Sequence, residues 1–270
     1  MSAKLPTRLE PSFHEKIWGT ADLEPWFPRA EKKIGEVWFP PPPELPILVK
    51  FLFTSARLSV QVHPPDEYAR RHEHSAGKTE MWHILRAAPG GEIALGFREP
   101  ITRDRLRESA ASGEIEKLLR WIPVHAGETY FTPAGTVHAI GGGLALCEIQ
   151  QLSDVTYRLY DYGRPRELHL DKGAGVAHLG PHAGAAVPTH IGPDHKLLAR
   201  CPYFETESLS IAVERQYAFA RPHLLILLDG RGRFGDLSCR AGEVWFAAAG
   251  AGFTIEPATP LRLLRTSLPA

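Results

Sequence analysis

Side chains that can hold a metal ion recur in the first half of the chain at strand-like spacings. Gln61 and His63 stand two residues apart, as do Lys78 and Glu80. Alternate residues of a strand share one face, so the members of each pair lie side by side. His138 follows a Pro- and Gly-containing turn, which would aim its imidazole back toward the preceding strands. Imidazole, carboxylate and amide oxygen together predict metal chemistry.

The elements that position these residues are expected to be short β-strands. The chain has 24 Gly and 24 Pro spread over its 270 residues, so turns come often, and the segments between them are rich in β-branched and aromatic residues. No βαβ alternation is present, and a mainly β sandwich or barrel is indicated. The expected strands are Ile47 to Phe53, Arg57 to His63, Glu80 to Leu85, Glu92 to Gly96, Glu128 to Thr132, Ala145 to Gln150 and Thr156 to Asp161.

Two segments depart from the strand pattern. Residues 102–122 begin with Thr102, a good helix cap, and carry apolar residues at helical spacing, interrupted at Ser112-Gly113, so a small helical insertion is expected there. Residues 164–198 are rich in Gly and Pro and predict a connection with one short helix near residues 168–177.

A faint internal repeat divides the chain. The segment Gly127 to Gly135 recurs as Gly242 to Gly250 with a similar order of glycine, acidic and aromatic residues. The first copy continues to His138 and the second to Phe253, so chemistry is expected in the first half alone. We expect residues 1–165 to form the metal-binding half, with the helical insert at about 102–122. Residues 166–200 would connect it to a degenerate second half, residues 201–270, which closes and stabilises the fold.

Charge and cysteine content exclude several classes of protein. Lys plus Arg and Asp plus Glu both total 31, so there is no net charge to drive binding to nucleic acid or an anionic membrane. The three cysteines, Cys147, Cys201 and Cys239, form no CxxC pair and favour a reducing compartment. The N-terminal residues lack the apolar stretch of a signal peptide. We therefore expect a cytoplasmic protein with a small-molecule partner, either a monomer or a homodimer.

The turn before His138 carries the first resemblance to a known family. Gly127, Pro133, Gly135 and His138 have the spacing of the second conserved motif of cupins. The resemblance implies double-stranded β-helix (cupin, jelly-roll) halves, here two of them as in a bicupin. It also implies that the earlier metal ligands come from a preceding strand pair. Gln61, His63 and Glu80 then complete a set with His138.

Further segments resemble type I mannose-6-phosphate isomerases of the short bacterial form. The resemblance extends from about Lys16 to Lys172, through the segments Lys16 to Gly19, Ile34 to Trp38, Leu58 to Pro64, Gly77 to Trp82 and Glu148 to Asp161. It implies an aldose-ketose isomerase that interconverts mannose 6-phosphate and fructose 6-phosphate through an enediol. In that family Gln61, His63, Glu80 and His138 would hold one zinc ion, although other divalent metals suit the set, and Arg158 would be the catalytic arginine.

An aldose-ketose isomerisation needs a group that transfers the proton, a cation that polarises the sugar oxygens and side chains that bind the phosphate. Arg158 could stabilise the enediolate, and Glu148 and Asp154 are candidates for proton transfer, with Lys78 a further catalytic candidate. Lys50, Ser59 and Lys78 lie on or beside the metal-bearing strands and are the candidates for binding the phosphate. The sequence does not choose among the candidate bases.

Plainer interpretations stand beside these. A lone histidine such as His138 is more often structural than a ligand. Arg158 could form a structural ion pair with Asp161 or Asp154, Glu148 could be a buried hydrogen-bond acceptor, and Lys50, Lys78 and Ser59 could be ordinary strand residues. His72-Glu73-His74 mimics the first cupin motif but reads as an exposed helix and loop. His83 should face away from Glu80, packed or hydrogen-bonded, and Cys147 should be a small core residue.

Two other functions remain open at this point. One is a non-catalytic, sugar-phosphate-binding bicupin regulator that keeps the fold and the metal without turnover. The other is a cupin oxygenase, which would use iron, mostly histidine ligands and a hydrophobic pocket. Gln61 and the nearby lysines favour the isomerase over the oxygenase.

Overall fold

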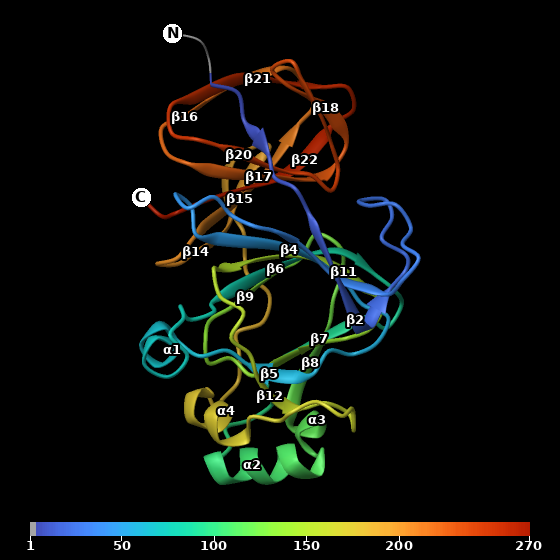
Figure 1. The fold of residues 1–270 in the computed structure, drawn as a ribbon, viewed down its shortest axis with the longest axis vertical. Helices are drawn as coiled ribbons and strands as arrows, with labels where there is room; N and C mark the ends of the chain where they lie inside the picture. Colours follow the sequence, from blue (N-terminus) through green and yellow to red (C-terminus); the bar gives the residue numbers. More distant parts are fainter. Residues whose placement is uncertain (1–3) are drawn as a thin grey trace.

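Four antiparallel β-sheets are stacked along the long axis of the computed structural model, which describes residues 4–270 (Figure 1). The first half of the chain forms two of them. The six-stranded sheet has the order β2 (Ser12–Thr20), β3 (Ile34–Phe39), β4 (Ile47–Phe53), β11 (Leu144–Gln151), β6 (Glu80–Ala87) and β9 (Thr129–Thr132). The five-stranded sheet has the order β12 (Tyr157–Tyr160), β5 (Val60–Val62), β10 (His138–Ile140), β7 (Glu92–Phe97) and β8 (Leu119–Pro123).

The other two sheets form the C-terminal half. The seven-stranded sheet has the order β1 (Thr7–Arg8), β20 (Val244–Ala247), β17 (His223–Asp229), β22 (Leu261–Ser267), β15 (Glu205–Ile211), β14 (His195–Arg200) and β13 (Thr189–Gly192). The four-stranded sheet has the order β16 (Arg215–Phe219), β21 (Ala251–Pro257), β18 (Arg231–Phe234) and β19 (Leu237–Arg240). The mainly β fold class predicted from the sequence, with a small helical insertion, is confirmed.

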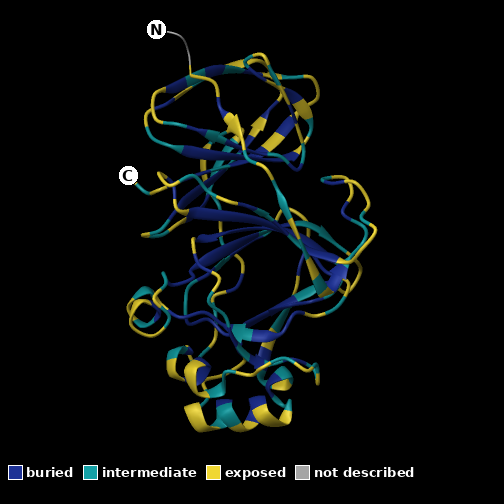
Figure 2. Ribbon diagram, in the orientation of Figure 1, coloured by how far each residue is buried: buried dark blue, intermediate teal, exposed yellow. Residues whose placement is uncertain are grey.

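Strand β4 shows how the sequence builds both the core and the site. All seven of its residues are buried, because both faces of its sheet are covered (Figure 2). Phe51 and its alternate neighbours join a core that also contains Leu224, Ile226 and Leu264 of the seven-stranded sheet. Lys50 points the other way, into the first half of the molecule. The two halves are thus joined by an apolar layer, with polar chemistry on its opposite side.

The helical insertion is confirmed but ends earlier than expected. Thr102 accepts a hydrogen bond from the Arg105 backbone nitrogen at 3.1 Å and caps α2 (Arg103–Ser112), which is followed by the one-turn α3 (Ile115–Leu118). Residues 119–122, expected to be helical, form strand β8, paired with β7. The ladder to β7 overrides the local apolar spacing. Helices α2 and α3 cover the outer face of the five-stranded sheet, together with α4 (Leu170–Val176).

The expected connection, residues 166–200, contains α4 near the predicted place, and it also contains strands. β13 and β14 extend the seven-stranded sheet through pairing of β14 with β15. At the other edge of this sheet, β1 pairs with β20, and the chain then runs down to β2 in the first half (Figure 1). The sheet of the C-terminal half therefore draws on residues outside 201–270. We retain the division into two halves as a proposal, with this wider membership.

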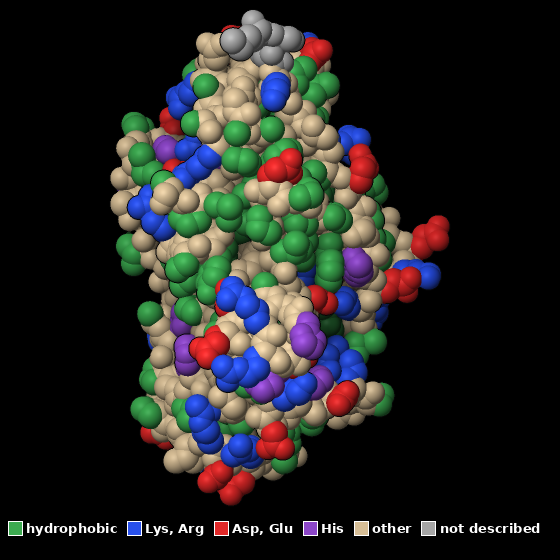
Figure 3. All heavy atoms as spheres, turned by 60° about the vertical axis from the view of Figure 1, so that its left-hand side comes forward, with side chains coloured by type: hydrophobic (Ala, Val, Ile, Leu, Met, Phe, Trp, Pro, Cys, Tyr) green, Lys and Arg blue, Asp and Glu red, His purple; other side chains and the backbone are tan. Residues whose placement is uncertain are grey.

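Helix α1 (Asp66–His72) lies in the segment between β5 and β6. None of the four helices in residues 4–270 has the length and apolar character needed to cross a membrane. On the face drawn in Figure 3, Lys and Arg side chains are interspersed with Asp and Glu, and hydrophobic side chains gather across the middle. Side chains of both signs are thus present on this face, in a chain whose positive and negative residues are equal in number.

Candidate active site

His63, Glu80 and His138 come together inside the first half of the molecule. Their candidate ligand atoms all lie within 4.8 Å of one another, and each residue is about 1% exposed. Glu80 begins β6 and His138 begins β10, while His63 follows β5. The carboxylate lies between the two rings, with Oε2 3.6 Å from His63 Nε2 and Oε1 3.5 Å from His138 Nε2. In the part of the chain that the structure describes, this is the one such group of His, Cys, Asp or Glu.

Backbone carbonyls orient both imidazoles. His63 Nδ1 donates to the Val155 carbonyl and His138 Nδ1 to the Thr136 carbonyl, each at 2.9 Å. The proton is thereby held on Nδ1, and each Nε2 lone pair faces the centre of the group, where His63 Nε2 accepts from Lys78 Nζ at 3.1 Å and His138 Nε2 accepts from Gln61 Nε2 at 3.3 Å. Burial lowers the pKa of His138 to about 4 and that of His63 well below its usual value, so both rings are neutral at pH 7. Neutral imidazoles with inward lone pairs are the form that binds a metal.

The donor set fits a divalent metal in a further respect. Glu80 Oε1 is buried and has no hydrogen-bond partner among residues 4–270, although a buried carboxylate oxygen normally has one. A cation between the three residues would satisfy this atom. The set therefore has the chemistry of a metal centre, with two nitrogens and one anionic oxygen.

Gln61 is the fourth residue predicted for the set, and it lies beside the other three. It pairs directly with His138 across β5 and β10, and its Nε2 is 3.3 Å from His138 Nε2. Ser59 Oγ donates to Gln61 Oε1 at 3.1 Å. The two ends of an amide are assigned from their hydrogen bonds, and turning the amide over would bring Oε1 toward the histidine. Gln61 also lines the open pocket above the buried group.

Two lysines and three carboxylates form a network at the inner wall of the pocket. Lys78 Nζ donates to Glu80 Oε2 at 2.5 Å and lies 3.6 Å from Glu148 Oε1. Lys50 Nζ lies 3.6 Å from the same Glu148 oxygen and 3.3 Å from Asp154 Oδ1. Lys50, Lys78, Glu80 and Glu148 are each less than 5% exposed, whereas the Asp154 side chain is 63% exposed at the mouth.

The network perturbs the ionisation of its members. Burial opposes the charge on Lys78, but the nearby Glu148 and Glu80 carboxylates outweigh it and raise the lysine pKa. Burial also raises the pKa of Glu148, with a further contribution from Glu80, while Lys78 and Lys50 act against the rise. Trp82 Nε1 donates to Glu148 Oε2 at 3.1 Å and fixes the orientation of that carboxylate. Glu148 is thus held by a hydrogen bond and two ammonium groups.

Arg158 lines the opposite wall and forms no salt bridge with any residue of the described range 4–270. The structural ion pair considered from the sequence is absent, because Arg164 and Arg166 both bind Asp161 and Asp154 binds Lys50. Arg158 Nη1 donates to the Glu167 carbonyl at 2.8 Å, and its buried Nε has no hydrogen-bond partner in the described part of the chain. Its positive charge is consequently available to a bound anion.

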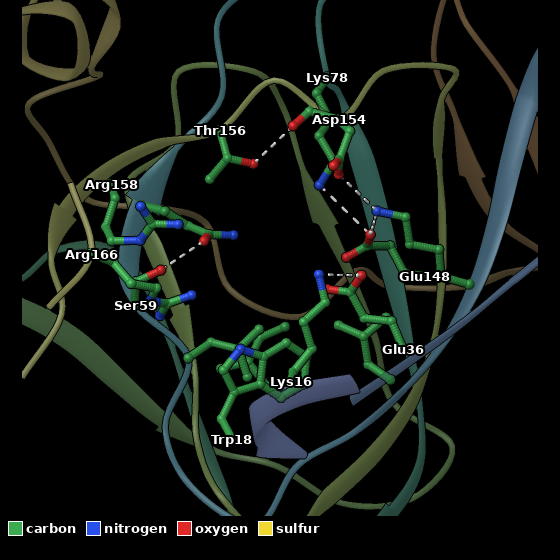
Figure 4. Close-up of a pocket in the computed structure, with 15 residues that line it drawn as sticks. Lys16, Trp18, Glu36, Ser59, Lys78, Glu148, Asp154, Thr156, Arg158 and Arg166 are labelled. Carbon is green, nitrogen blue, oxygen red and sulfur yellow. Dashed lines mark hydrogen bonds and ion pairs between the residues drawn. The ribbon is translucent and has the colours of Figure 1, made fainter. Parts of the chain in front are cut away.

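These walls enclose a pocket of about 260 Å³ (Figure 4). Arg158, Arg166 and Ser59 lie on one side, with Lys78, Asp154 and Glu148 on the other. Every catalytic or phosphate-binding candidate from the sequence lines it: Lys50, Ser59, Lys78, Glu148, Asp154 and Arg158.

The pocket also has lining residues to which sequence reasoning gave no role. Lys16 and Trp18 come from β2, and Glu36 from β3. Glu36 accepts a hydrogen bond from Trp38 Nε1 at 2.7 Å and pairs with Lys16 at 3.3 Å. Burial works to raise the pKa of Glu36, but Lys50 and Lys16 lower it below its usual value. Their segments carried the family resemblance, and strand alternation on β2 was the signal that Lys16 and Trp18 share a face.

The rival candidates lie elsewhere. His72 and His74 are exposed at and just beyond the end of α1, and His72 stacks on Tyr68. His83 faces away from Glu80, and its Nδ1 is 2.9 Å from Thr129 Oγ1, as predicted. Cys147 is buried in the core between the halves, where burial raises its thiol pKa, and the prediction of a core cysteine is confirmed.

Sequence comparison identifies relatives over most of the chain. It is 39% identical to the mannose-6-phosphate isomerase of Streptococcus mutans over 198 residues, covering 70% of this chain and 62% of that protein. It is 31% identical to a probable mannose-6-phosphate isomerase, GmuF, of Bacillus subtilis, covering 93% of this chain and 96% of the relative. The chain thus spans somewhat under two thirds of the first relative and nearly all of the second. No protein-family model matches it.

Structural comparison agrees with these sequence relatives. The crystal structure of the mannose 6-phosphate isomerase from Bacillus subtilis superposes with a TM-score of 0.85 at 28% identity, covering 97% of this chain and 99% of that one. A putative mannosephosphate isomerase from Archaeoglobus fulgidus, with a TM-score of 0.80 at 17% identity over the whole of both chains, shares the fold. From these similarities, the chain belongs to the type I mannose-6-phosphate isomerase family.

Proposed function

We propose that this protein interconverts mannose 6-phosphate and fructose 6-phosphate through an enediol, using a bound divalent metal. The observation that carries the proposal is the buried His63, Glu80 and His138 group, which reaches the pocket through Gln61. Lysines paired with carboxylates line that pocket, together with Arg158, which has no acidic partner among the residues that the structure describes. Moving a proton between adjacent carbons needs these components: a proton carrier, fixed cations and a polarising centre.

Gln61, His63, Glu80 and His138 would hold the metal, which we take to be zinc, although manganese, iron or cobalt suits the same donors. When bound, it would supply Lewis-acid polarisation of the sugar oxygens. The support for this comes from the inward Nε2 atoms and the unpartnered Glu80 oxygen. The two carbonyl acceptors behind the rings would keep the imidazoles in their ligating tautomer.

Glu148 is our candidate for carrying the proton between the two carbons. Trp82 and two lysines fix its carboxylate from three directions, and positional precision of this kind favours proton transfer. Asp154 is the alternative, held by Lys50 alone and largely exposed at the mouth. Lys78 would keep a positive charge beside both Glu80 and Glu148, and would donate to a substrate oxygen.

Arg158 would stabilise the negative charge that develops on the enediolate, because no carboxylate within residues 4–270 forms a salt bridge with its guanidinium. Ser59 lies on the same side of the pocket and could donate to the phosphate. We keep Lys50 and Lys78 as phosphate-binding candidates, although both ammonium groups already contact carboxylates. The three free cysteines support a reducing, cytoplasmic location.

A coupled assay with mannose 6-phosphate tests the proposal. Purified protein would be assayed as isolated, after chelation, and after zinc is restored, with metal content measured in each sample. Activity that is lost on chelation and regained with zinc is the expected result. Protein that binds metal in every replete sample but never turns over the substrate would contradict the isomerase assignment.

A matched pair of variants separates the metal site from general damage to the fold. His138→Ala removes a proposed ligand, whereas His83→Gln changes a half-buried histidine of β6 that faces away from Glu80. We expect the first variant to lose metal and turnover and the second to keep both. Equal metal retention in the two variants would show that His138 is not a ligand.

A further inference from the structure

A second pocket, with a volume of about 620 Å³, lies in the C-terminal half on the surface of the β18–β19 hairpin. Its lining includes four arginines, Arg8, Arg231, Arg233 and Arg240, and two carboxylates, Glu243 and Glu256. None of these residues belongs to the candidate active site, whose pocket lies in the other half of the molecule. We call the four side chains the arginine cluster.

Strand alternation sets three members of the arginine cluster on the outer face of the hairpin, and the fourth, Arg8, comes from β1. Gly232 and Phe234 are buried on the inner side of β18, so Arg231 and Arg233 both point outward. Across the hairpin Arg231 pairs directly with Arg240. Side chains opposite each other in an antiparallel pair have Cβ atoms about 5 Å apart, and like charges in that position repel. The pairing of β18 with β19 therefore holds the positively charged side chains of Arg231 and Arg240 next to each other.

The neighbouring carboxylates leave much of this charge uncompensated. Glu243 lies 3.4 Å from Arg8 Nη1 and 3.7 Å from Arg240 Nε, and it also accepts a hydrogen bond from Trp245 at 3.1 Å. Within residues 4–270, Arg231 and Arg233 form no ion pair, and Glu256, which is opposite Arg233 in the ladder, forms none either. Glu10 also pairs with Arg8, at 3.5 Å. Four arginines therefore face three carboxylates, and the positive charge that is left without an ion pair is that of Arg231 and Arg233 on the hairpin.

We propose that the arginine cluster binds the dianionic phosphate group of a small phosphorylated molecule. Guanidinium forks from two adjacent strands match the oxygens of a phosphate, and each can donate two parallel hydrogen bonds. A phosphate between Arg231 and Arg240 would replace their repulsion with two attractions. A small ligand fits better than nucleic acid, because the cluster is confined to one pocket of a protein with no net charge. This site is independent of the proposed isomerase reaction.

Titration calorimetry with inorganic phosphate, at constant ionic strength maintained with chloride, tests the proposal. The wild-type protein should show a phosphate site that the double variant Arg231→Gln/Arg240→Gln lacks or binds at least tenfold more weakly. Arg215→Gln is the matched control, because Arg215 is an exposed arginine in the same sheet but outside the pocket. Its binding should equal that of the wild type.

A second readout keeps the test independent of turnover. Phosphate should raise the melting temperature of the wild type and the control more than that of the double variant. Mannose 6-phosphate turnover should stay within twofold in all three proteins. If the double variant does not fold, Arg8→Gln can replace it, because Arg8 lies outside the hairpin. Its phosphate binding would then be compared with that of the wild type and the control. Phosphate binding of equal strength and stoichiometry in the double variant and the wild type would overturn the proposal and leave a solvated arginine face.

Discussion

Replacing His83 with glutamine should flatten the acid limb of the stability curve without affecting catalysis. Burial, and to a smaller extent Arg262, lowers the pKa of His83 to about 4. An unfolded histidine titrates near pH 6.5. Between these two values the unfolded chain takes up a proton that the folded chain does not, so the free energy of unfolding falls as the pH falls. Above pH 7 both states are neutral, and the residue contributes no pH dependence.

The size of the effect follows from the two pKa values. Each pKa unit corresponds to about 1.4 kcal/mol, so His83 accounts for at most about 3 kcal/mol of the stability lost between pH 7 and pH 4. Glutamine does not titrate, and its amide can still hydrogen-bond Thr129 Oγ1. In urea unfolding at several pH values, the free energy of unfolding of the wild type should fall more steeply with falling pH than that of His83→Gln.

The difference between the curves, and not either curve alone, measures the histidine. Carboxylates lose their partners over the same range, but they do so equally in both proteins. A constant offset from repacking is expected and does not alter the slope. Two curves that stay parallel from pH 7 to pH 4 would show that His83 is not held neutral, and the reasoning from its burial would fail. Loss of metal in His83→Gln would separately contradict its orientation away from Glu80.

Four further outcomes are expected. His138→Ala should retain less than about a tenth of the wild-type metal after dialysis, by elemental analysis, because half of the imidazole donors are gone. Arg158→Lys should lower kcat about 10²-fold in the coupled assay, since the charge is kept but the fork is lost. Glu148→Gln should lower kcat by about 10²- to 10⁴-fold and Asp154→Asn by less than about tenfold, and the reverse order would make Asp154 the proton carrier. Phe51→Ala should cost about 3 to 5 kcal/mol in urea unfolding, because its ring is fully buried between the two halves.

Much of the first half could be predicted from short-range patterns. The run Ile47–Phe53 was predicted with the bounds that β4 has in the structure, because both its apolar character and its flanking turns are local. Gln61 and His63 were predicted to share a face by alternation, and they do meet His138. Whether a segment forms a strand depends here on nearby residues, and alternate residues of a strand share one face. Both features can therefore be predicted from the sequence.

Other features depend on partners far along the chain. Residues 119–122 have helical apolar spacing, and only their pairing with β7 makes them a strand. Arg158 forms no ion pair with Asp161 because Arg164 and Arg166 both bind that carboxylate. The sequence alone does not show which of the nearby arginines pairs with Asp161. Lys16, Trp18 and Glu36 reach the pocket through the way β2 and β3 lie against it. Tertiary packing decides which arginine binds a given carboxylate and which strands line the pocket.

The internal repeat explains why the two halves differ in chemistry. In each copy a strand, β9 or β20, leads into a turn that contains a glycine with positive φ, Gly135 or Gly250. The residue three positions after that glycine lies on the next strand, β10 or β21. In the first half that residue is His138, buried beside Glu80. In the second it is Phe253, packed in an apolar core with stacked aromatic rings. The same backbone thus supplies a ligand position in one half and a core position in the other. The arginine cluster lies on the outer surface of the second half, away from this apolar core.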